Sequence, residues 1–89
     1  MIVIDRDVRG MPLWLLRDYL VELGGVVTQD EPRYARVAGD GWTAVISRIE
    51  DFQIGSLKVG QLHLTVDGRA DAMAQLTPHL EKKLLRAGG

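Results

Sequence analysis

The chain has no cysteine, no asparagine and only one phenylalanine among its 89 residues. Without cysteine it can form no disulfide and no thiolate metal site, and it has no cysteine nucleophile. The absence of cysteine and asparagine, together with eight arginines against three lysines, is typical of a thermophile, and a GC-rich genome gives a similar bias.

The chain also lacks an excess of charge of either sign. Eleven basic and twelve acidic residues give a net charge of −1, whereas a general nucleic-acid binder or a polybasic membrane-surface protein needs a basic surplus. No apolar run approaches the roughly 20 residues that span a bilayer. Asp5, Arg6 and Asp7 stand where a signal peptide would need an apolar stretch. We therefore expect a cytoplasmic protein that binds neither nucleic acid nor membrane.

What remains is the composition of an ordinary soluble domain. Apolar residues make up 46% of the chain and charged residues 26%, so disorder is not expected. A chain of 89 residues can bury one small core and no more. We therefore expect a single domain over residues 1–89.

Two segments have the apolar spacing of amphipathic helices. The first follows Pro12, repeats leucine at steps of three, four and three, and ends at Gly24-Gly25. The second covers about residues 70–86. Pro78 lies inside it, so we expect the second helix either to kink there or to break, with Thr77 capping a new segment.

Alternating or β-branched residues predict strands between the helices and before the first one. Asp40-Gly41 is expected to form a type I′ turn that pairs Val37 with Ala44 and Ala35 with Ile46. Residues 50–60 are apolar but interrupted by glycine, and we expect a folded-back connector that tucks its side chains against the core, with some strand as the alternative that the sequence leaves open. The expected strands cover residues 2–8, 26–29, 33–38, 42–49 and 61–66.

The element order is then β-α-β(4)-α, an α+β fold. Because each helix has one apolar stripe, the simplest packing places both helices on one face of an antiparallel sheet and leaves the other face uncovered. That uncovered face is the candidate interface, and it should carry Tyr34, Arg36, Thr43, Val45, Ser47, His63 and Thr65.

Other candidate sites carry weaker signals. His63 should lie on the uncovered face beside polar residues, and no metal-ligand spacing accompanies it. Asp5 and Asp7 are expected to be solvated edge charges. A pocket between the sheet and the helices is the alternative binding site, with its mouth near Trp14, Trp42, Phe52, Ile54 and Leu57.

The segments Phe52–Gly60 and Leu62–Gly68, with the ending Leu84–Gly89, resemble a small domain of Thermus-type bacteria. It is similar to the C-terminal domain of proteins related to the small subunit of molybdopterin synthase. The resemblance implies a fold like that of the TATA-binding protein, and no catalytic motif comes with it. The sulfur-carrier domain that comes first in such fusions is absent from this sequence. A fold name carries no DNA-binding implication.

Gly88-Gly89 admits two interpretations. Sulfur carriers end in Gly-Gly because a thin tail threads into an adenylating enzyme, whereas a Gly-Gly pair directly after a helix is usually a cap and a frayed end.

The sequence therefore predicts a non-catalytic protein-interaction or oligomerisation domain, accessory to molybdenum-cofactor or sulfur-carrier biology. No nucleophile with a base and an orienting group can be assembled, so we expect neither an enzyme nor a bound cofactor. The alternative is a small-ligand binder that uses the pocket between sheet and helices.

Overall fold

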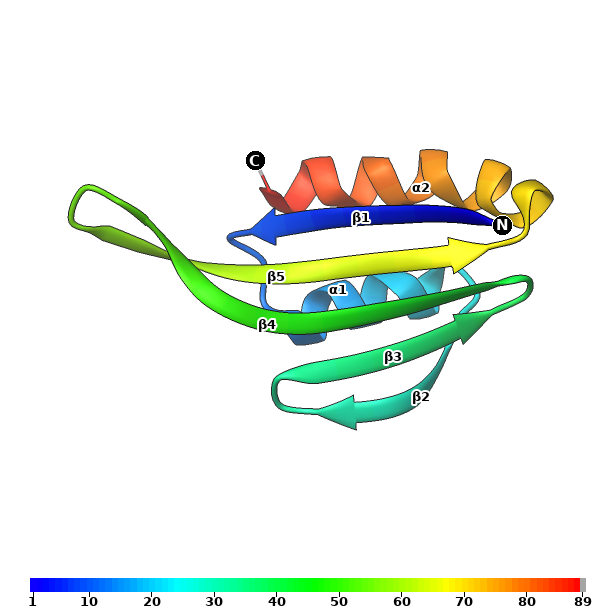
Figure 1. Ribbon diagram of the computed structural model, residues 1–89, viewed down its shortest axis with the longest axis horizontal. Helices are drawn as coiled ribbons and strands as arrows, with labels where there is room; N and C mark the ends of the chain where they lie inside the picture. The colour runs from blue at the N-terminus through cyan, green and yellow to red at the C-terminus, as the bar shows by residue number, and fades with distance from the viewer. Residues whose placement is uncertain (89) are drawn as a thin grey trace.

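A computed structural model describes residues 1–88, with side chains described as far as residue 85. It confirms the α+β class. Five strands form one antiparallel sheet in the order β1-β5-β4-β3-β2, and both helices lie behind that sheet in Figure 1. The elements are β1 (Ile2–Arg9), α1 (Leu13–Glu22), β2 (Val26–Glu31), β3 (Tyr34–Gly39), β4 (Trp42–Ile54), β5 (Leu57–Gly68) and α2 (Ala70–Gly88).

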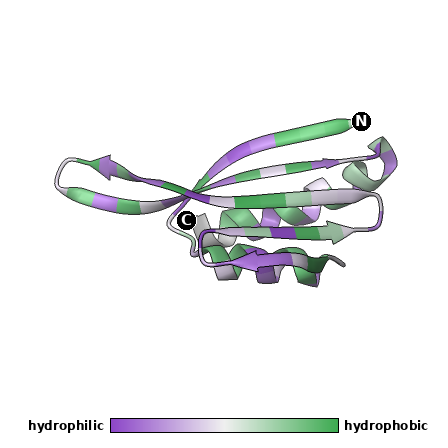
Figure 2. Cartoon of the chain, turned by 60° about the horizontal axis from the view of Figure 1, so that its bottom comes forward, coloured by the Kyte–Doolittle hydropathy of each residue, from purple (hydrophilic) through white to green (hydrophobic). Residues whose placement is uncertain are grey.

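One apolar core fills the space between the sheet and the helices. Both predicted leucine stripes face it, and so does every second residue of β3, β4 and β5, because side chains alternate between the two faces of a strand. Figure 2 shows from a second angle that both helices lie on the same side of the sheet. The buried core residues are Val8, Met11, Leu13, Leu16, Leu20, Ala35, Val37, Trp42, Ala44, Ile46, Leu62, Leu64, Val66, Met73, Leu76, Leu80 and Leu84.

The predicted register of β3 and β4 is confirmed, but the turn type is wrong. Val37 pairs with Ala44 and Ala35 pairs with Ile46. A type I′ turn needs a positive φ at both central residues. Among the described residues only glycines have positive φ, so Asp40 does not adopt it, whereas Gly41 has φ +83°.

The prediction that residues 50–60 tuck against the core is wrong, whereas the alternative of some strand in this segment is confirmed. β4 and β5 continue past the helices as a two-stranded arm, which extends to the left in Figure 1 and turns at Gly55, where φ is +59°. The ladder shifts register between Ile49 and Phe52, as expected for a β-bulge. The arm forms because Phe52 pairs with Val59 and Ile54 with Leu57, so the apolar residues cover one another across the ladder.

Of the two alternatives predicted at Pro78, a kink or a break, the break is wrong, because α2 is one helix from Ala70 to Gly88. Pro78 is exposed, and its missing N–H costs roughly 3 kcal/mol. Three buried leucines of α2 pack on the core, Leu76 before Pro78 and Leu80 and Leu84 after it. Each contributes about 1.5–3 kcal/mol. The Thr77 hydroxyl does not cap a new segment but donates to the Met73 carbonyl oxygen at 2.7 Å.

Candidate functional site

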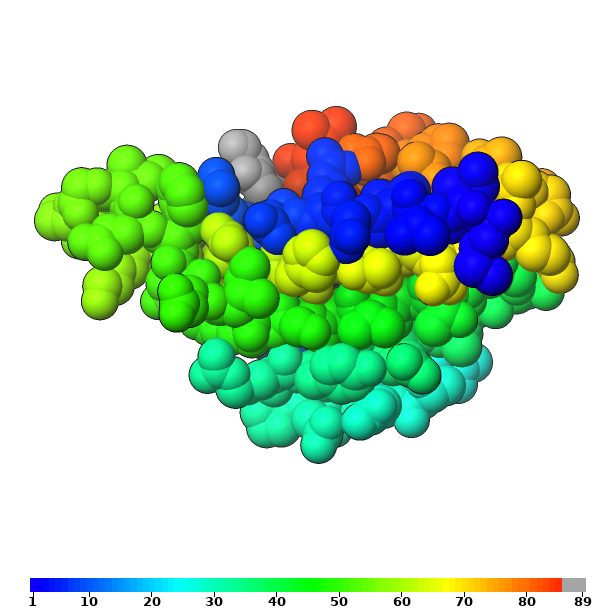
Figure 3. Space-filling view, in the orientation of Figure 1, coloured from blue at the N-terminus to red at the C-terminus, as the bar shows by residue number. Residues whose placement is uncertain are grey.

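The sheet face opposite the helices is not covered by any element of the described chain. In Figure 3 side chains of β1, β5, β4 and β3 form the front surface, and no helix lies over them. We call this surface the open face. All seven residues of the predicted interface alternate with buried core residues, so the structure brings them together on the open face: Tyr34, Arg36, Thr43, Val45, Ser47, His63 and Thr65.

His63 occupies a more elaborate setting than the sequence predicts. β1 pairs with β5 so that Asp5 faces Thr65 and Asp7 faces His63. The imidazole lies between the two carboxylates, with Nε2 2.7 Å from an oxygen of Asp5 and Nδ1 2.8 Å from an oxygen of Asp7. The Thr65 hydroxyl donates to the same Asp5 oxygen at 2.7 Å. Both aspartates are exposed on the edge strand β1, as predicted, but in addition they hold the imidazole of His63 between them. We call these four residues the His63 cluster.

The contacts of the His63 cluster favour a protonated imidazole. Both ring nitrogens face carboxylate oxygens, and only the cation has an N–H on each nitrogen. The hydrogen bond to Asp7, followed by that to Asp5, raises the pKa of His63 above its ordinary value. The hydrogen bond from Thr65, followed by that from His63, lowers the pKa of Asp5. All four side chains are at least partly exposed, so water screens this pair of contacts.

The open face continues onto the β4–β5 arm. The Arg9 guanidinium carbon lies 3.6 Å from the centre of the Phe52 ring, a cation–π geometry. Ile54 and Leu57 form the next pair toward the tip, and their exposed fractions are 59% and 68%. Large apolar side chains this exposed suit a contact surface rather than a core.

The predicted pocket is not formed, because its five residues lie in three places. Trp14 is 56% exposed and lines a hollow of about 390 Å³ at the start of α1, together with Arg17 and Arg48. Phe52, Ile54 and Leu57 belong to the arm instead.

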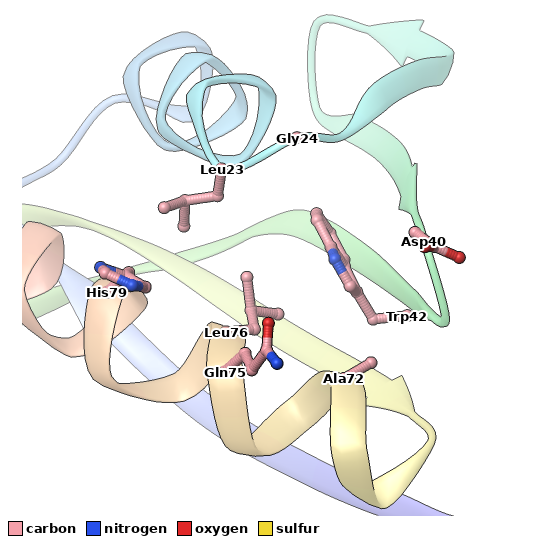
Figure 4. A pocket seen from close by; sticks show the side chains of 8 residues that line it. All are labelled: Leu23, Gly24, Asp40, Trp42, Ala72, Gln75, Leu76 and His79. Carbon is pink, nitrogen blue, oxygen red and sulfur yellow. The ribbon is translucent and has the colours of Figure 1, made fainter.

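Trp42, the fifth pocket residue, is buried between the end of α1, the β3–β4 turn and α2. It borders a hollow of about 290 Å³ that Figure 4 shows from close by. Leu23 and Leu76 provide apolar walls, whereas Gln75 and His79 provide polar groups from α2. This hollow, without Trp14 or the arm residues, is what the structure offers in place of the predicted pocket.

Three further findings concern the C-terminal end, metal sites and membrane spans. Gly88 is the last residue of α2, and Gly89 lies outside the described residues, so the structure does not bear on a modified terminus. Within residues 1–85 no three His, Cys, Asp or Glu side chains gather as a metal site. Neither helix of the described chain is long and apolar enough to cross a membrane.

Comparison with known proteins gives one match. A search of curated proteins finds no relative of this chain. The family model described as archaeal MoaD-like protein matches residues 4–89, which is nearly the whole chain. MoaD is the small subunit of molybdopterin synthase, so the match confirms the resemblance seen in the sequence. The chain therefore belongs to the archaeal MoaD-like protein family.

Proposed function

We propose that this chain is a non-catalytic protein-interaction domain in molybdopterin and sulfur-carrier biology, and that the open face is its binding surface. The observation that carries the proposal is that both helices cover one side of the sheet while the other side is uncovered. The middle of the open face carries the short side chains of Thr43, Val45 and Ser47 on β4, which form a flat surface that another protein can approach closely.

The state of His63 supports binding rather than catalysis. A general base needs a ring nitrogen with a free lone pair within reach of the substrate. In the His63 cluster both ring nitrogens are held by carboxylates, at 2.7 and 2.8 Å. In addition, none of the buried residues of the described chain is polar or charged, whereas catalytic groups act most strongly where water is excluded.

A matched pair of substitutions tests the proposal. Val45 lies at the centre of the open face, and Val21 lies on the outer side of α1, where 42% of it is exposed. Val45→Arg should weaken association at least tenfold, because a long charged side chain would then protrude from the centre of the open face. Val21→Arg should leave it within twofold. Association is measured by light scattering for the chain itself and by calorimetry with purified molybdopterin synthase large subunit.

Two results would overturn this proposal. One is equal association by Val45→Arg and the unsubstituted chain. The other is the absence of any association, with itself or with the large subunit, at about 100 μM, which corresponds to a free energy weaker than about −5.5 kcal/mol.

The hollow beside Trp42 supports a second candidate function, small-ligand binding. Its size is close to the lower end of the roughly 300–1,000 Å³ of ligand sites, and Trp42 would report an occupant by its fluorescence. A bound fragment at 100 times its dissociation constant should stabilise the fold by about 2.7 kcal/mol. This candidate is ruled out if no fragment of a library raises Tm and none quenches the fluorescence of Trp42, with Trp42→Phe as the control for quenching.

A further inference from the structure

The open face carries acidic residues toward its β1 edge and a basic residue on β3, and Asp67 on β5 adds a third carboxylate. Asp5 and Asp7 are on β1 at one edge, and Arg36 is on β3, with β5 and β4 between them. Arg36 is exposed, and it takes part in none of the ion pairs found within residues 1–85. Asp5 and Asp7 share the single imidazole of His63, so two carboxylates and one cation leave net negative charge at the β1 edge, and Arg36 presents an unpaired cation on β3.

The strand register places the opposite charges in the same row across the sheet. Asp5 pairs with Thr65, Thr65 with Val45 and Val45 with Arg36, so an acid stands at one end of this row and a base at the other. In the adjacent row Asp7 stands at the β1 end and Tyr34 at the β3 end, with His63 and Ser47 between them.

These rows are self-complementary under a twofold rotation. Consider an axis that runs parallel to the strands, between β5 and β4, in front of the open face. Rotation about it keeps every row in register and places β1 over the partner's β3. Asp5 then faces the partner's Arg36, and Asp7 faces the phenol of the partner's Tyr34. Because a twofold contact is isologous, each of these pairs occurs twice.

Three other twofold arrangements place like charges together. An axis along β4 itself moves β1 over the partner's β2, where Asp7 meets the partner's Glu31, since Glu31 pairs with Tyr34 in the same row. An axis across the strands places β1 over the partner's β1, so that aspartates face aspartates. An axis along β5 places Asp67 over the partner's Asp67 and leaves Arg36 facing no strand. The axis between β5 and β4 is the one of these that places opposite charges over each other, and the charge pattern therefore favours it.

The size of the face is adequate for such a pair. The four strands that face each other, about 4.8 Å apart with up to eight residues each at about 3.4 Å, give a footprint of roughly 500 Å² before side-chain relief is counted. Stable interfaces bury about 800 Å² of accessible surface per partner. The arm, with Ile54 and Leu57 exposed, extends the apolar part of this surface.

We infer that the open face binds a second copy of this chain, sheet against sheet, with Asp5 of each copy paired to Arg36 of the other. This inference rests on the proposed function, because it names the occupant of the proposed binding surface. Aligned packing of twisted sheets at about −30° is an established way to cover two such faces.

Charge reversal tests the inference, because two defective variants should repair each other. Arg36→Glu places Glu opposite Asp5 in both contacts, and Asp5→Arg places Arg opposite Arg36, so each variant alone should associate at least tenfold more weakly. In a mixture, one copy of each variant restores opposite charges at both contacts, and a heterodimer should form. Lys82→Glu, a charge reversal on the exposed side of α2, should leave the dimer unchanged. Light scattering and native mass spectrometry measure all four samples.

A second variant guards against misfolding, since Asp5 also bonds His63 and Thr65 in its own chain. Asp5→Asn keeps the shape, removes the charge and should weaken the dimer severalfold. A mixture that stays monomeric, or a dimer that Arg36→Glu leaves intact, overturns the inference. A monomeric unsubstituted chain at 1 mM also overturns it. The proposed function survives that last result if Val45→Arg still abolishes binding of the molybdopterin synthase large subunit, and it fails if no protein binds.

Discussion

Trp42 is packed between glycines so closely that a single added methyl group should destabilise the fold. A Cβ atom built on Gly39 would lie 2.0 Å from Cε2 of the Trp42 indole, far inside the 3.0 Å that real Cβ contacts respect. The ring cannot simply move away, because a Cβ on Gly25 would also lie only 2.9 Å from its far edge. Trp42 itself is 7% exposed. Gly39→Ala therefore overpacks the core at this end.

The expected cost can be measured by urea and thermal unfolding followed by circular dichroism. Overpacking of a filled core costs about 1–3 kcal/mol, and a domain of this size loses about 4–8 °C of Tm per kcal/mol. Gly60→Ala is the matched control, because its Cβ would meet Arg48 at an ordinary 3.7 Å. That control should change the free energy of unfolding by less than about 0.5 kcal/mol.

A double-mutant cycle identifies the cause of the destabilisation. In a Trp42→Leu background the indole is gone, so Gly39→Ala should cost at least about 1 kcal/mol less than in the unsubstituted chain. Gly39 does not have a positive φ, so backbone strain cannot produce the effect. An equal cost in both backgrounds, or a cost within about 0.5 kcal/mol of zero, would refute the reasoning.

Three further predictions concern the His63 cluster, the arm and α2. The pKa of His63 is raised mainly by the Asp7 hydrogen bond. The stabilisation that protonated His63 gives to the fold is therefore full below about pH 6.5. It is lost as the pH rises through the raised pKa of His63 in the folded chain. Asp7→Asn should lower the pKa of His63 in an NMR titration, and an unchanged pKa would contradict the assigned cause. Replacing exposed Ile54 and Leu57 together by serine should change the free energy of unfolding by less than about 1 kcal/mol, so a collapse of Tm would show that the arm belongs to the core. Pro78→Ala should raise Tm, because it restores a helix hydrogen bond and removes the clash of the proline ring, which together cost up to about 3 kcal/mol. A lower Tm would show that the proline is needed.

Local patterns in the sequence were sufficient for the helices, the β3–β4 register and the identity of the open face. The leucine stripes fix which side of each helix is buried, and the alternation along β3 and β4 fixes which residues face outward. Both follow from periodicity within a single element, which does not depend on distant parts of the chain. The sequence alone is therefore sufficient to assign the seven residues of the predicted interface to one face of the sheet.

Long-range pairing could not be predicted in the same way. Asp7 and His63 are 56 positions apart, and they meet only because β1 adds to the β5 edge of the sheet. Nothing local to Asp7 signals that partner, so the His63 cluster was missed. The two-stranded arm is not predicted for a related reason, because Gly55 and Gly60 interrupt the apolar pattern of residues 50–60. In the structure Gly55 forms the turn and Gly60 lies opposite the bulge.

The claim that association occurs on the open face is tested most directly by NMR of the isotope-labelled chain over a dilution series from millimolar to low micromolar concentration. The account predicts that amide signals of Thr43, Val45, Ser47 and Thr65 shift together with concentration, while those of Val21 and Lys82 on the helices stay fixed. Concentration-dependent shifts confined to the helices, with the sheet signals constant, would contradict it.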